Sequence, residues 1–156
     1  MTDAPEITTA LMRGLAEDLA GAGLVRYAPG GGYPRDPAEH DEDASTFLPP
    51  AVQFQQMLAD PPRSVSISFY DITSPADTTA TAVSLQLRIR LGWEPLEGID
   101  LLTALSRRLH QRQHAQLGNV HVSFIRRLSA GPMGPDEQGR PEFTSNYRFT
   151  GLSLTG

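Results

Sequence analysis

Apolar residues recur with two different periods along this chain, and the two periods predict helices and strands in separate stretches. From Pro5 to Ala20 they recur about every four residues, which predicts a helix with one apolar stripe. The stretch from Leu96 to Gln113 repeats this spacing through Leu101, Leu105 and Leu109. We therefore expect two amphipathic helices whose apolar stripes face a common core.

Strict alternation of apolar and polar residues predicts strands elsewhere in the chain. The strongest run extends from Val83 to Leu91, and the run from Ser64 to Tyr70 alternates in the same way. Leu24 to Tyr27 is a shorter strand candidate. The segment from Ala51 to Ala59 lies between prolines and is compatible with a short helix.

The C-terminal part of the chain predicts a hairpin. Residues from Val120 to Phe124 alternate between apolar and polar, and so do those from Phe143 to Phe149. Between these runs, the glycines and prolines of residues 130–141 exclude a helix and favour a long loop. We expect Phe149, like Leu87 in the strongest strand, to be buried under the helices.

Together these elements predict an α/β (α+β) architecture. We expect a four- to five-stranded, mainly antiparallel sheet with both helices on one face and a long-looped C-terminal hairpin. A length of 156 residues suits one domain, so we assign residues 1–156 to a single domain. Residues 35–62 contain an acidic run and several prolines, and we expect them to form a loop-rich insertion.

Composition excludes several classes of site. The chain contains no cysteine, which rules out disulfides, cysteine–zinc sites and thiol nucleophiles. No apolar run reaches the roughly 18 residues that a membrane-spanning helix requires, so we expect a soluble protein without membrane contact. The first 78 residues hold 12 acidic side chains and 4 arginines, whereas the remainder hold 6 and 9. This uneven charge would allow opposite charges to meet between copies of the chain.

One face of the predicted sheet is polar and rich in arginine. If the apolar positions face the helices, the opposite face carries Ser66, Ser68, Gln86, Arg88, Arg90, His121, Ser123, Arg127, Asn146 and Arg148. An ordinary solvated face explains this pattern if the coding sequence favours arginine. A subunit or partner interface also explains it, because arginine forms planar, bidentate contacts. A nucleic-acid groove fits less well, since the face lacks exposed aromatics and the net charge is −5.

The interface interpretation names six candidate contact residues. They are Arg88, Arg90, Arg127 and Arg148 on the sheet, with Met133 and Arg140 in the predicted loop. Met133 would supply an adaptable apolar contact and Arg140 a charged one. We expect the loop to become ordered against a neighbouring protein, and we expect Arg88 to contribute little to folding.

No pattern in the chain predicts catalytic chemistry. His110 and His114 are four residues apart, as in a helical metal site, but Gln111 stands where the zinc-protease motif has glutamate. The glycines at 30–32 lack the following Gly-Lys-Ser/Thr of a phosphate-binding loop. We therefore expect a protein that is not an enzyme and has no catalytic, cofactor-binding or metal site.

The stretch HVSFIRRLSAGPMGPDEQGRPEFTSNYRFT, from His121 to Thr150, resembles the C-terminal signature of phage tail-terminator proteins, a family also described as minor capsid proteins. Its pattern is a strand ending in Arg-Arg, a loop with a Gly-Arg turn, and an aromatic strand. The segments GLVRYAPGGGYP and VSLQLRIRLG, together with the N-terminal helix, are similar to the family as well. The resemblance covers most of the chain and is loosest from about Asp36 to Pro62.

This resemblance implies a structural role in a virion. Tail terminators form a ring, typically of six subunits, on the last layer of the tail tube protein. They stop tube polymerisation and present the surface that joins the neck, or head–tail connector, while genomic DNA passes through the lumen without being recognised. Assembly would occur in the bacterial cytoplasm, and the protein would reside at the tail–neck junction. The alternatives are a neck or head-completion protein of the same virion and, more distantly, a host enzyme or ligand-binding module.

Overall fold

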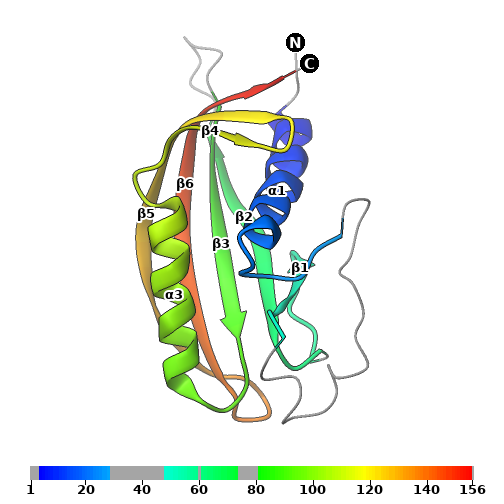
Figure 1. Cartoon of the computed structure of the whole chain (residues 1–156), viewed down its shortest axis with the longest axis vertical. Coiled ribbons are helices and arrows are strands. Elements are labelled where there is room, and N and C mark those ends of the chain that lie inside the picture. The colour runs from blue at the N-terminus through cyan, green and yellow to red at the C-terminus, as the bar shows by residue number, and fades with distance from the viewer. Residues whose placement is uncertain (1–3, 29–47, 60, 74–80, 156) are drawn as a thin grey trace.

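The computed structural model describes residues 4–28, 48–59, 61–73 and 81–155, which form two helices and one six-stranded sheet (Figure 1). The helices are α1 (Ala4–Gly21) and α3 (Pro95–Leu109). The strands are β1 (Ala51–Phe54), β2 (Ser64–Thr73), β3 (Thr81–Arg90), β4 (Gln113–Leu117), β5 (Val120–Pro135) and β6 (Pro141–Leu154). Neither helix is long and apolar enough to cross a membrane.

The strand order is β1-β2-β3-β6-β5-β4, and every neighbouring pair is antiparallel except β1 and β2. The α+β class and the mainly antiparallel sheet are therefore as predicted. The prediction of four to five strands is wrong, because β1 and β4 add a strand at each edge of the sheet. Of the predicted insertion at 35–62, residues 35–47 and 60 lie outside the described residues, as does the glycine turn at 30–32.

Both helices pack on one face of the sheet and share a single apolar core (Figure 1). The stripe of α1 places Leu11, Leu15 and Leu19 in this core without exposed surface, because residues three or four apart share one side of a helix. Leu87 of β3 and Phe149 of β6 are also fully buried, which confirms both predictions.

The segment predicted as a short helix at Ala51 to Ala59 forms β1 instead. Ala51 and Val52 pair in parallel with Ser64 and Val65 of β2. Four residues are too few to show a period in sequence, so only the partner strand decides their conformation. The predicted strand at Leu24 to Tyr27 is reduced to one bridge, in which Arg26 lies along the outer edge of β1.

The second helix ends at Leu109, four residues before the predicted end. Gln111 has a φ of 63°, and its N–H donates to the Ile125 carbonyl at 2.8 Å. The Arg112 carbonyl accepts from the Ile125 N–H at 3.0 Å, so hydrogen bonds to β5 replace those of a further helical turn. His114 consequently lies in β4 and not on the helix, which removes the helical spacing of the two histidines.

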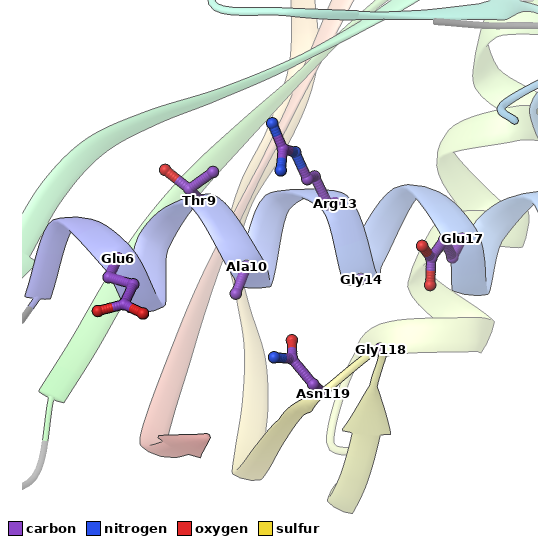
Figure 2. A pocket seen from close by; sticks show the side chains of 8 residues that line it. All are labelled: Glu6, Thr9, Ala10, Arg13, Gly14, Glu17, Gly118 and Asn119. Carbon is purple, nitrogen blue, oxygen red and sulfur yellow. The ribbon is translucent and has the colours of Figure 1, made fainter. Parts of the chain in front are cut away.

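Helix α1 meets the β4–β5 turn at a close backbone contact. A Cβ at Gly14 would overlap the Leu117 carbonyl group, and a Cβ at Gly118 would lie 3.1 Å from the Gly14 Cα. Figure 2 shows Gly14 on the side of α1 that faces Gly118. Gly118 also has a φ of 59°, a left-handed conformation that glycine adopts without strain. The two glycines therefore set the distance between α1 and this end of the sheet.

Asp18 links the two helices electrostatically. Its carboxylate accepts hydrogen bonds from Arg108 at 3.0 and 2.9 Å and from Arg112 at 3.0 Å. Burial acts to raise the pKa of Asp18, but the hydrogen bonds and charges of the two arginines outweigh it and lower that pKa below 3.8. The ionised form of Asp18 is therefore favoured by folding.

We expect Gly14→Ala to destabilise the fold by at least about 1–3 kcal/mol, because the backbone of the β4–β5 turn has to move. The matched control is Gly21→Ala at the end of the same helix, where nothing lies within 4 Å of an added Cβ. That change should be neutral or stabilising by up to about 1 kcal/mol. Urea unfolding measures both values, and an equally stable Gly14→Ala protein would refute the close contact.

The Asp18 cluster predicts a specific pH dependence. A carboxylate with a lowered folded pKa contributes stability above its unfolded pKa, near 3.8, and that contribution is lost as the pH falls through the lower folded value. Asp18→Asn should thus reduce stability at neutral pH by about 1–2 kcal/mol. It should also flatten the loss of stability below pH 3.8. Glu17→Gln, on the exposed side of α1, is the control and should leave both the stability at neutral pH and its loss at low pH as they are in the wild type. Thermal melts at several pH values measure both variants.

Candidate interaction surface

The sheet face opposite the helices is polar, as the sequence predicts, and its side chains form hydrogen-bonded rows across the strands. We call it the polar sheet face and define it by Ser66, Ser68, Asp71, Ser84, Gln86, Arg88, Arg126, Ser129, Thr144, Asn146 and Arg148. In one row Gln86 donates to the Asn146 side chain at 3.3 Å, and Asn146 donates to Ser129 at 2.9 Å. Antiparallel register fixes these rows, because directly opposed residues lie on the same face.

A second row crosses the sheet from edge to edge and is charged at both ends. It consists, in order, of Asp71 on β2, Ser84 on β3, Arg148 on β6 and Arg126 on β5. Arg148 lies 3.4 Å from the Asp71 carboxylate and donates to the Ser84 hydroxyl at 3.3 Å. Arg126 and Arg148 are thus two like charges in directly opposed positions, an unfavourable arrangement in a sheet.

Arg88 lies on this face and forms a bidentate pair with Glu142. Its Nε and Nη2 donate to the two carboxylate oxygens at 2.9 and 2.7 Å. The hydrogen bond with Glu142 raises the pKa of Arg88. The side chain of Glu142 is buried, whereas that of Arg88 is about one-third exposed. Arg88 therefore neutralises a buried carboxylate, and the expectation that it contributes little to folding does not fit this geometry.

Arg90 belongs to the same side of the sheet but is an internal residue, only 2% exposed. Its guanidinium donates to the carbonyls of Leu58, Pro61 and Pro62 at 2.7 to 2.8 Å. Burial and the nearby charge of Arg140 lower the pKa of Arg90. Arginine satisfies this site because its planar fork donates in several directions at once. Within the monomer Arg90 thus holds the segment preceding β2 and is not a surface contact.

Arg140 is also an internal residue, at 5% exposure. It donates to Asp136 at 2.8 Å and to the Ala59 carbonyl at 3.2 Å. Burial favours a raised pKa for Asp136, but the backbone and side-chain hydrogen bonds of Arg140 lower it overall. The sequence did not reveal the contact with Ala59, because Ala59 lies 81 residues from Arg140 along the chain, whereas Asp136 is only four residues away.

Arg127 lies on the face opposite to the one predicted. It is directly opposed to Tyr147, on the helix side, whereas Arg126 is opposed to Arg148. The apolar positions shift between Val122 and Ile125, beside Gly151, which has a φ of 65°. A residue in the left-handed conformation interrupts the alternation of side chains between the two faces of the sheet. Beyond it, every second residue counted from Val120 no longer lies on the same face as Val120. The glycine in an otherwise aromatic strand was the available signal.

The predicted loop at 130–141 is mostly strand. Pairing of β5 with β6 continues to Pro135 and Pro141, and only residues 136–140 form the connecting turn. Every residue from Arg126 to Pro135 except Gly131 is exposed. We call this part of β5 the arm. Met133 is 45% exposed on it, and Leu128 is exposed to a similar degree.

Two grooves adjoin α1. Along its outer side, a groove of about 660 Å³ carries both acidic and basic side chains (Figure 2), with Glu6, Arg13 and Glu17 on the helix and Asn119 beyond the β4–β5 turn. A smaller groove of about 340 Å³, between α1 and the outer edge of β2, is lined in part by Met12, Phe54, Phe69 and Ile72. Among the residues described, no three histidine or acidic side chains are grouped to hold a metal ion.

We expect Arg88→Ala to destabilise the fold by about 1–3 kcal/mol, because it leaves the buried Glu142 carboxylate without its bidentate partner. Arg126→Ala is the matched control, since this exposed arginine has no acidic partner in the described part of the chain. The control should stay within about 0.5 kcal/mol of the wild type. Equal melting temperatures for the two variants would show that the Arg88–Glu142 pair contributes nothing to stability.

The polar sheet face, the arm and the two grooves are thus the surfaces that the described residues offer for contact. No known protein-family model matches the chain, and no curated protein matches its sequence.

Proposed function

We propose that this chain is a structural virion protein that forms a ring on the end of a phage tail tube. The ring stops tube polymerisation and supplies the surface to which the neck of the head attaches. The proposal joins the resemblance of residues His121 to Thr150 with the geometry that these same residues adopt. It requires no catalytic group, and its partners are further copies of the chain, the tube protein and a head–tail connector.

The arm is the observation that supports this proposal best. Nine of the ten residues of the arm are exposed, with apolar Leu128 and Met133 among them, so their side chains add little to the core of the monomer. Its tip is nevertheless firmly held, because Asp136 accepts hydrogen bonds from the backbone N–H groups of Gln138 and Arg140 at 2.9 and 2.8 Å. An ordered, exposed arm is suited to contact another protein.

A ring also fits the charges of the chain. A head-to-tail contact that closes on itself uses two different surfaces of each subunit. The arm carries Arg126 and Arg127, whereas the opposite edge of the sheet carries Asp71. The arm and the uncovered part of β2 therefore carry opposite charges, which supports a heterologous contact over a symmetric one. Double-stranded DNA would then pass through the lumen without specific contacts.

Met133→Glu tests the role of the arm in tail completion. The charge sits on an exposed residue, so the purified variant should melt within about 0.5 kcal/mol of the wild type. Particles carrying it should show overlong or headless tails by electron microscopy. Leu96→Glu is the control, because Leu96 is an equally apolar, exposed residue on α3. Tails of normal length joined to heads in the Met133→Glu particles would refute a role for the arm.

Averaged images of complete particles test the ring itself. The proposal expects six-fold density of this chain above the last tube layer. Twelve-fold density at the head portal would instead indicate a neck or head-completion protein. A single copy per particle, or absence of the chain from the particle, would overturn both assignments.

A further inference from the structure

The sheet has two open edges, and they lie at opposite sides and opposite ends of it. On one side β1 covers β2 only from Ser64 to Ile67, so no described strand pairs with the outer edge of Phe69–Thr73. On the other side β4 covers β5 only as far as Phe124, and beyond Arg127 the outer edge of the arm is open in the described chain. Unpaired backbone N–H and C=O groups at such edges are templates for another strand.

The two open edges are partly protected, which limits where a strand can add. His110 already accepts from the Arg127 N–H at 3.0 Å, and Pro132 and Pro135 have no N–H to donate, so the usable part of the arm is Leu128–Ala130. On the outer edge of β2, the Gln55 side chain accepts from the Phe69 N–H at 2.6 Å, so this N–H is not available to an added strand. In the described chain, three residues therefore remain available on the arm, Leu128–Ala130, and four on β2, Tyr70–Thr73.

The directions of the strands make the two edges compatible. Each step from β2 through β3 and β6 to β5 reverses direction, so β5 runs opposite to β2. Copies that are related by rotation about a ring axis would therefore bring β5 of one copy antiparallel to β2 of the next. The open segments are offset along the strands, and strands of a closed, tilted sheet are staggered in this way from one to the next.

Charge at the two edges is complementary. The charged row ends in Asp71 on β2 and in Arg126 on β5. Arg126 faces the like charge of Arg148 within its own chain, and the side chain of Asp71 is 49% exposed. Placing Asp71 of a neighbouring copy near Arg126 would give this arginine a carboxylate, as Arg148 already has in the Asp71 of its own chain.

Apolar surface lies beside the same edge of β2. Phe69 and Tyr70 are exposed there, and the groove of about 340 Å³ lined by Met12, Phe54, Phe69 and Ile72 runs next to them. Leu128 is the exposed apolar residue within the usable part of the arm. An added strand would thus place one exposed apolar residue, Leu128, at an edge that carries apolar surface, as well as forming backbone hydrogen bonds.

We propose that copies of this chain join edge to edge, with Leu128–Ala130 of one copy adding as an antiparallel strand to Tyr70–Thr73 of the next. This inference deepens the proposed ring and rests on it for the identity of the partner. The contact is heterologous, so each copy offers one edge and receives the other. A closed ring of such contacts carries one continuous sheet through all of its subunits.

Charge exchange tests the orientation of this contact. Asp71→Arg and Arg126→Asp should each weaken self-association by about tenfold or more, because like charges then meet at every contact. The double variant should associate within about threefold of the wild type. A one-to-one mixture of the two single variants should also recover, because alternating copies pair Arg with Asp at every contact of an even-numbered ring. Sedimentation at several concentrations measures all four, with Asp71→Asn and thermal melts as controls for folding.

Disulfide trapping tests the contact directly, because the chain has no cysteine of its own. Tyr70→Cys, combined in turn with Leu128→Cys and Ser129→Cys, should give under oxidation a ladder that ends at the ring size. Three strand spacings separate the two edges within one chain, about 14 Å, which exceeds the roughly 7 Å limit between Cα atoms of a disulfide. The single-cysteine variants should give no product larger than a dimer.

The outcomes separate this inference from the proposed function. Six-fold rings on tails without any trapped ladder or charge rescue would overturn edge pairing and leave the tail role standing. A trapped ladder with charge rescue, but no ring on tails, would support edge pairing and refute the tail role. If the protein neither forms a ladder nor appears on tails, both proposals are wrong.

Discussion

The β5–β6 hairpin is longer than the core that covers it, and this excess length shapes the rest of the molecule. Its two strands pair from Val120 and Leu154 to Pro135 and Pro141, with two shifts of register along the way. Helices α1 and α3 cover the apolar residues near its base and centre, including Val122 and Phe149. The described residues do not cover the remaining length of β5, which is exposed as the arm. The open edge of the arm and the turn at its tip both follow from this extension.

Periodicity in the sequence predicted the elements that bury a complete apolar stripe. Helix α1 and strands β2, β3 and β6 have enough turns or alternations for the period to identify them. Strand β1 has four residues and no readable period, and β4 begins where hydrogen bonds to Ile125 replace the helical ones. In both cases a distant part of the chain determines the local conformation, and one sequence does not show such a partner.

The candidate surface was predicted in part, and the failures have the same origin. Alternation along β3 and β6 correctly placed Arg88 and Arg148 on the polar face. The position of Arg127 was wrong because Gly151 changes the facing of the strands beside it. Arg90 and Arg140 are buried because the segment before β2 and the turn at the end of the arm close over them. The face of the sheet on which a residue lies was therefore predicted from sequence more reliably than how deeply that residue is buried.

The buried arginines have a mechanical consequence. Arg90, on the central strand β3, donates to carbonyls of the segment before β2, and Arg140 binds both Ala59 of that segment and Asp136 at the tip of the arm. These charge-assisted hydrogen bonds tie the end of the arm to the other side of the sheet. Force applied to the arm is therefore carried across the sheet to β2 and does not act on the base of the hairpin alone. A pull on the arm at one edge of the sheet is therefore also felt by β2 at the other edge.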